Sequence, residues 1–244
     1  MKEYKIVKIA KERFENTDGQ SVHFVDDPYA NSFLNDLENY PHAFVLACLM
    51  DRQIKAERAS IIPVTIKGHL KTFEINDLSE YSLADYKKIF NEKKLHRFND
   101  TMAEIFYCGI QDIKRMYNGD ASEIWKNKPS SSHVVYKFLE FKGCGVKIAT
   151  MAANTLARQF KIPFSDYYSI DISPDVHIKR VMERMGFIPK NAGIEMVIYK
   201  ARELYPEFPG IIDFSCWEIG RKWCKPNNPK CSECEVSDEC EKVL

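Results

Sequence analysis

The sequence carries no net charge, since its 244 residues include 35 basic and 35 acidic side chains. This balance argues against a protein whose whole surface binds nucleic acid, but it does not exclude a local basic face, because phosphate contact depends on where charges lie. No apolar run approaches the length of a membrane span, and the N-terminal residues lack the apolar core of a signal peptide. Blocks of Lys and Arg, internal repeats and low-complexity tracts are also missing. We therefore expect a globular intracellular protein with no membrane segment.

Signals for β-strands are scarce, whereas helical spacing of apolar residues recurs along most of the chain. Residues 32–37 predict a short helix, and the mixed spacings of residues 63–95 predict several more. The chain is long enough for one large domain or two small ones. We expect an all-α protein, with longer helices at 101–117, 148–160, 174–185, 195–204 and 211–223.

A glycine pair, Gly143 and Gly145, separates two of these helical patterns. Glycines allow a tight turn between helices and a close approach to a partner. The free N–H groups at the start of the second helix would form an anion site suited to a DNA phosphate. Between residues 136 and 161 five basic side chains stand against Glu140 alone, which favours this interpretation. The alternative is an ordinary helix–turn–helix corner, because such turns commonly contain glycine.

Lys147 follows the glycine pair at the expected start of the second helix. A lysine amine is a nucleophile only when it is neutral, and both the positive end of a helix dipole and a desolvated pocket favour that form. Such an amine could form a Schiff base. The alternative is a solvent-facing lysine that contacts a phosphate or nothing.

A second helix start lies at Ser173-Pro174-Asp175, about thirty residues further on. Here we expect Ser173 as the N-cap, Pro174 at the first helical position and Asp175 in the first turn. Asp175 is a candidate catalytic carboxylate, although an acidic residue there is also a routine partner of the helix dipole. His177, on the same helix, is expected to pack or to contact phosphate rather than to bind a metal.

Four of the eight cysteines fall within seventeen residues near the C-terminus, with six, two and five residues between them. Clustered cysteines in an intracellular chain suggest metal binding before disulfides. Structural zinc favours two Cys-x-x-Cys pairs, and only one such pair is present here, so a four-iron four-sulfur cluster is favoured over zinc. The expected ligands are Cys224, Cys231, Cys234 and Cys240.

These motifs resemble those of a known family. Gly143-Cys-Gly-Val-Lys147-Ile-Ala, with Asn154-Thr155 beyond it, looks like the helix-hairpin-helix of endonuclease III-type DNA glycosylases. Pro174-Asp-Val-His-Ile-Lys-Arg-Val181 is similar to that family's catalytic-aspartate segment, and the six-two-five cysteine spacing is that of its iron–sulfur cluster. One departure is Lys142, which stands where the family usually has a proline.

The resemblance implies a two-lobed helix-hairpin-helix glycosylase fold. A helical barrel lobe would span 41–157, and an iron–sulfur cluster lobe would combine 1–40 with 158–244, its cluster loop lying in 217–244. Lys147 would be the Schiff-base lysine and Asp175 the essential carboxylate. Six residues are expected to contact DNA. Gln53 would fill the space left by a flipped base, and Arg97 would enter the duplex as a wedge. The others are Gly143 and Gly145 in the hairpin, and Lys225 and Lys230 in residues 225–230, the first cluster loop.

The implied activity is base excision from damaged double-stranded DNA by a monomer, with lyase activity through Lys147. In a prokaryote it would act in the cytoplasm and nucleoid. Two alternatives stay open: a monofunctional glycosylase in which Asp175 activates water, and a non-catalytic iron–sulfur DNA-binding protein. The lesion is not readable from the sequence, and an oxidised pyrimidine is the default that the resemblance supplies.

Overall fold

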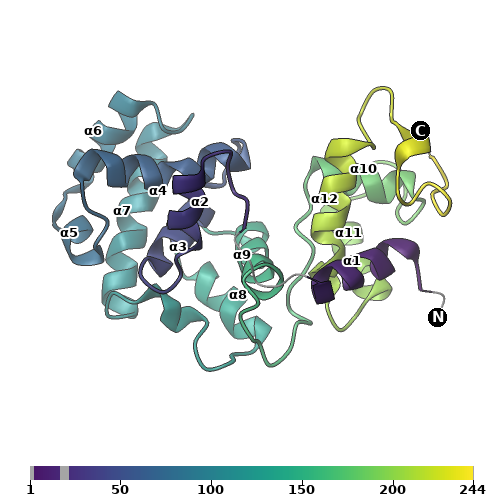
Figure 1. Ribbon diagram of the computed structural model, residues 1–244, viewed down its shortest axis with the longest axis horizontal. Helices are drawn as coiled ribbons and strands as arrows, with labels where there is room; N and C mark the ends of the chain where they lie inside the picture. The colour runs from purple at the N-terminus through teal and green to yellow at the C-terminus, as the bar shows by residue number, and fades with distance from the viewer. Residues whose placement is uncertain (1–2, 17–21, 244) are drawn as a thin grey trace.

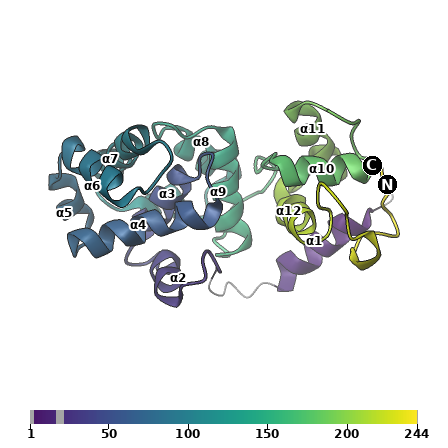
Figure 2. The ribbon, with the colours of Figure 1, turned by 90° about the horizontal axis from the view of Figure 1, so that it is seen from above.

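The computed structural model describes residues 3–16 and 22–243, and within these ranges its secondary structure is helical throughout. The expected all-α class is confirmed. Two groups of helices lie side by side along the long axis of the molecule, α2–α9 in one and α1 with α10–α12 in the other (Figures 1 and 2). In the described part of the chain no helix is long and apolar enough to cross a membrane.

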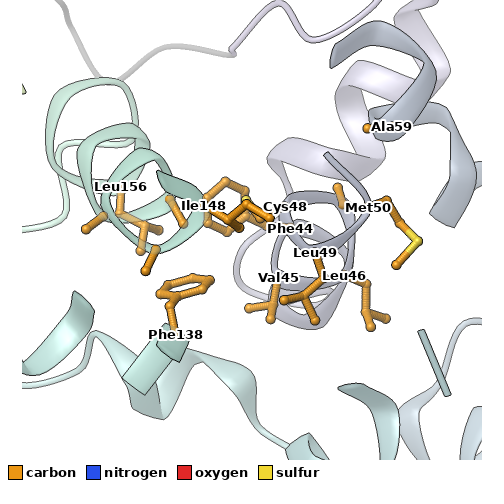
Figure 3. Packing of buried hydrophobic residues seen from close by; sticks show 14 of the residues in the cluster. Phe44, Val45, Leu46, Cys48, Leu49, Met50, Ala59, Phe138, Ile148 and Leu156 are labelled. Carbon is orange, nitrogen blue, oxygen red and sulfur yellow. The ribbon is translucent and has the colours of Figure 1, made fainter. Parts of the chain in front are cut away.

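The larger group is built around α3 (Pro41–Met50), in which every residue is buried. This helix packs against α4, α7 and α9. Figure 3 shows Phe138 and Ile148, from the two hairpin helices, facing the α3 side chains. The other members are α2 (Pro28–Asn35), α4 (Ala56–Leu70), α5 (Ile75–Glu80), α6 (Leu83–Lys93), α7 (Asn99–Met116), the 3₁₀ turn η1 (Ala121–Ile124), α8 (Ser131–Leu139) and α9 (Val146–Arg158).

The smaller group joins the two ends of the chain. Helix α1 (Lys5–Asn16) packs on η2 and α12, and Arg13 donates to Ser215 Oγ at 3.1 Å and to Glu235 at 3.1 Å. The N-terminal helix is therefore tied to the cysteine-rich end. The other members are α10 (Val176–Arg184), α11 (Ile194–Leu204), η2 (Pro209–Ile212), α12 (Asp213–Lys222) and η3 (Cys231–Glu233).

One local prediction was wrong and another was right in part. The helix expected at 32–37 begins at Pro28, because the Asp27 side chain accepts a hydrogen bond from the Ala30 N–H and proline fits the first turn. The short helices expected within 63–95 are present as α5 and α6, but the start of that range belongs to α4, which continues through Pro63 to Leu70. A proline removes one helical hydrogen bond, but the buried apolar face on either side of it keeps the helix in place.

The packing of α2 bears on the division into lobes. Helix α2 contacts α3 and α4, so it lies with the larger group, whereas the resemblance places residues 1–40 with the other lobe. We propose that α1 alone crosses to the smaller group. Residues 1–2, 17–21 and 244 of the expected lobe lie outside the described residues.

The hairpin turn depends on the backbone of Gly143. Its φ is +79°, and an added Cβ would lie 2.6 Å from Ile105 Cδ1 on α7. Only glycine combines a left-handed backbone with this approach at little cost. Gly145 differs, since it is the N-cap of α9 with a φ of −100° and has open space where a Cβ would be.

We expect Gly143→Ala to lower the free energy of unfolding by about 1–3 kcal/mol, because alanine is strained at this φ and would push on Ile105. Chemical denaturation of both proteins measures the difference. Gly145→Ala is the matched control and should cost less than about 1 kcal/mol. Equal losses at the two positions would contradict the role given to Gly143.

Candidate active site and cysteine cluster

Lys147 lies in the first turn of α9, two residues after the Gly145 cap. Its side chain is 47% exposed, so of the two conditions that favour a neutral amine the structure provides the helix start and not a desolvated pocket. Its Nζ lies 3.4 Å from Oδ2 of Asp51. Lys147 is therefore an accessible amine with a carboxylate beside it.

Asp51 is a residue that the sequence analysis missed. It ends the buried helix α3, where its N–H donates to the Cys48 carbonyl at 3.1 Å, and its side chain is only 15% exposed. The one sequence feature that pointed to Asp51 is its position, an acidic residue directly after a run of residues that are almost all apolar. Its partner is 96 positions away, so no local pattern could reveal the pair.

Asp175 caps α10, which corrects the predicted helix start. The Asp175 Oδ1 accepts hydrogen bonds from the N–H groups of His177 and Ile178, both at 2.8 Å. Ser173 was predicted to be the cap, but its N–H instead donates to Asp213 Oδ2 at 2.6 Å. An aspartate two residues later satisfies the free N–H groups directly, so the helix begins there.

Lys147 and Asp175 both lie in the described part of the chain, and no hydrogen bond or ion pair joins them. They belong to different groups of helices, Lys147 on α9 and Asp175 at the start of α10. In both views α9 lies at the edge of its group that faces the smaller group (Figures 1 and 2). The two side chains therefore do not contact each other in this structure. That both act on the same bound substrate stays a prediction.

A second carboxyl group, Asp213, lies next to Asp175. Desolvation raises the pKa of Asp213 to about 6, hydrogen bonds from Ser173 and the charge of Arg158 oppose that rise, and the charge of Asp175 adds to it. Burial also lowers the pKa of Arg158 to about 10. A raised aspartate pKa means that Asp213 holds its proton at higher pH than usual, which limits negative charge beside Asp175 below about pH 6.

Two exposed turns carry the expected DNA-inserting residues. Gln53 has a φ of +56°, and Arg97 lies 4.8 Å above the Phe98 ring. Arg58, near the start of α4, donates to the carbonyls of Leu95 at 3.2 Å and Lys94 at 2.7 Å, and His96 lies against the backbone of Arg52. These contacts place the two turns next to each other, and their joint insertion into a duplex stays a prediction.

Asp175 can be tested for both its roles. Asp175→Asn should keep the stability of the fold, because asparagine caps helices as well as aspartate does. Asp175→Ala should lose about 1 kcal/mol. Both should lower base-release rates at least about 10²-fold, because neither supplies a negative charge. Urea denaturation and single-turnover assays give the two readouts, and an active Asp175→Asn would contradict the catalytic role.

All four clustered cysteines line one cavity between α10, α12 and the C-terminal segment. Within residues 3–16 and 22–243 no three side chains of His, Cys, Asp or Glu gather closely enough to hold a single metal ion. Four cysteine sulfurs around one apolar cavity are the donor set that a four-iron four-sulfur cluster would need, and the assignment of the metal stays a prediction.

The contacts around this cavity suit thiolate ligands. Arg184 Nη1 lies 3.5 Å from the Cys224 Sγ, and hydrogen bonds to sulfur are among the features that tune iron–sulfur sites. The same guanidinium donates to the carbonyls of Lys225 at 2.6 Å and Pro226 at 2.9 Å. Arg180 donates to the carbonyl of Cys224 at 2.6 Å. Helix α10 therefore holds the first cluster loop and, at its other end, Asp175.

Both loop lysines are exposed. Lys230 lies 3.3 Å from Glu233, but an ion pair this exposed is weak, so both lysines stay candidates for contact with a phosphate.

A protein purified without air should contain about four iron and four sulfide per chain if the cavity holds the expected cluster. Cys234→Ser should lower both contents because it removes a ligand. Cys108→Ser, on α7 and far from the cluster residues in the chain, is the control and should leave them unchanged. Bound zinc without sulfide would contradict the assignment.

Comparisons with known proteins agree with this architecture. No protein-family model matches the sequence. Over 71 residues, 29% of the chain, it is 37% identical to endonuclease III of Thermotoga maritima, and the match spans only 33% of that relative. A solved endonuclease III–DNA complex superposes with a TM-score of 0.62 at 17% identity, covering 97% of this chain and 92% of that one. A thermostable thymine-DNA glycosylase gives 0.63 at 17% identity, covering 98% and 96%. The chain therefore has the endonuclease III fold.

Proposed function

We propose that this protein is a base-excision DNA glycosylase with lyase activity. One observation carries the proposal: a lysine amine lies in the first turn of the second hairpin helix, directly after a glycine-dependent turn, where it is accessible to DNA bound at the hairpin. Once it has lost its proton, such an amine can attack an extruded sugar and form a Schiff base. The fold shared with endonuclease III supports it.

DNA binding would centre on the hairpin. The unpaired N–H groups at the start of α9 would receive a backbone phosphate. Gln53 and Arg97, on adjacent exposed turns, would enter the duplex and replace the stacking of an extruded nucleotide. Lys225 would add a further phosphate contact from the cluster loop.

The chemistry would follow at the extruded sugar. Asp175 stabilises the positive charge that develops on the deoxyribose as the bond to the base breaks. The neutral amine of Lys147 attacks C1′ and forms a Schiff base, and the base departs. β-Elimination then cleaves the strand on the 3′ side of the lesion.

The cluster would have a structural part in this reaction. Cys224, Cys231, Cys234 and Cys240 would hold four iron and four sulfide, which crosslink the C-terminal segment. Because Arg180 and Arg184 connect that segment to α10, loss of the cluster would loosen the helix that Asp175 caps. The protein contributes the loop, the arginine contacts and the apolar cavity.

The preferred lesion depends on pocket shape rather than on the fold. The structural neighbours include an endonuclease III, a thymine-DNA glycosylase and an 8-oxoguanine glycosylase/lyase from Clostridium acetobutylicum, the last with a TM-score of 0.55. These names cover different bases, so the likeness does not select one. Oxidised pyrimidines are the first substrates to test.

Borohydride trapping on a panel of modified duplexes tests the proposal. Wild type should form a covalent adduct with at least one lesion, and Lys147→Gln should abolish it, because glutamine cannot form a Schiff base. Lys142→Gln is the matched control: it lies in the same hairpin, and its ion pair with Glu104 leaves Lys147 untouched. Normal trapping by Lys147→Gln would contradict the assignment, and base release without any adduct would favour the monofunctional alternative.

A further inference from the structure

The proposed reaction leaves one proton to be accounted for. An amine must lose a proton before it attacks C1′, and an opposing carboxylate both favours the charged ammonium and offers a place for that proton. The carboxylate that contacts the Lys147 amine in this structure is Asp51, at 3.4 Å. Asp175 already accepts two backbone hydrogen bonds at the start of α10.

Asp51 is held where such a group should be. It ends α3, a helix buried along its whole length, and its N–H is bonded to the turn before it. Helices α3 and α9 pack together, and Figure 3 shows Cys48 of α3 close to Ile148 of α9. The packing of α3 on α9 therefore fixes the backbone positions from which the Asp51 and Lys147 side chains extend.

The neighbouring titratable groups stay neutral. Burial raises the pKa of Cys144, in the hairpin turn, to about 12, and it raises the pKa of Cys48 well above its usual value. His96 lies against the backbone of Met50 and Arg52, and burial lowers its pKa. Near neutral pH, Asp51 thus faces Lys147 without a competing charge from these three side chains.

We propose that Asp51 is the catalytic base that takes the proton from the Lys147 ammonium, an assignment that rests on the proposed function. One proton moves from Nζ to Oδ2, and the freed electron pair forms the Nζ–C1′ bond. The electrons of the C1′–N bond leave with the base, which takes a proton from water, and Asp51 returns its proton to solvent. Asp175 is then left to stabilise the charge on the sugar.

The test is the pH profile of single-turnover adduct formation in Asp51→Asn. Without the base, only molecules whose lysine is already neutral react, so the rate near pH 7 should fall about 10²-fold and rise steadily toward pH 9. Asp51→Glu, which keeps a carboxylate, should restore most of the rate and the flatter profile. Asp112→Asn, which removes an exposed ion pair with Arg115 on α7, is the control and should match wild type.

Each outcome decides between roles. If Asp51 were only an ion-pair partner, Asp51→Asn would free the amine and react as fast as wild type or faster, which would overturn the proposal. Equal losses in Asp51→Asn and Asp51→Glu, with an unchanged pH profile, would indicate a purely structural role and would also overturn it. Absence of any adduct with wild type on every lesion would instead overturn the proposed function, and this assignment with it.

Discussion

The approach of the Gly143 backbone to Ile105 determines where α9 begins, and much of the site depends on that point. Because the turn is fixed against α7, the first turn of α9 is fixed against α3. Lys147 then lies 3.4 Å from Asp51, although the two residues are far apart in the sequence. The same turn leaves the N–H groups of α9 free for a phosphate. The turn at Gly143 therefore sets both the position of the Lys147 amine and that of the N–H groups proposed to contact DNA.

A second constraint joins the cysteine-rich end to the other half of the site. Arg180 and Arg184 on α10 donate to backbone carbonyls of the first cluster loop, while the opposite end of the same helix is capped by Asp175. A displacement of the first cluster loop can therefore shift α10 and, with it, the carboxylate of Asp175. Helix α1 adds to this, because Arg13 binds Glu235 within the C-terminal segment. The cluster region is thus built into the smaller group of helices.

Local patterns predicted the all-α class, the hairpin and the helix bearing Asp175, because each depends on residues close in sequence. They failed where distant packing decides. Helix α4 runs through Pro63 because its buried face outweighs one lost hydrogen bond. Ser173 is buried, with its N–H donating to Asp213, and the side chain of Asp175 caps α10 in its place. The Asp51–Lys147 pair was beyond prediction, since only the packing of α3 on α9 brings the two together.

The proposed function depends on which atom of the protein bonds to the sugar. Digestion of a borohydride-reduced protein–DNA adduct, followed by mass spectrometry of the modified peptide, identifies that atom's residue directly. We predict that the deoxyribose remnant is found on Lys147 alone. A remnant on another lysine, or on the N-terminal amine, would contradict the role of Lys147 as the nucleophile.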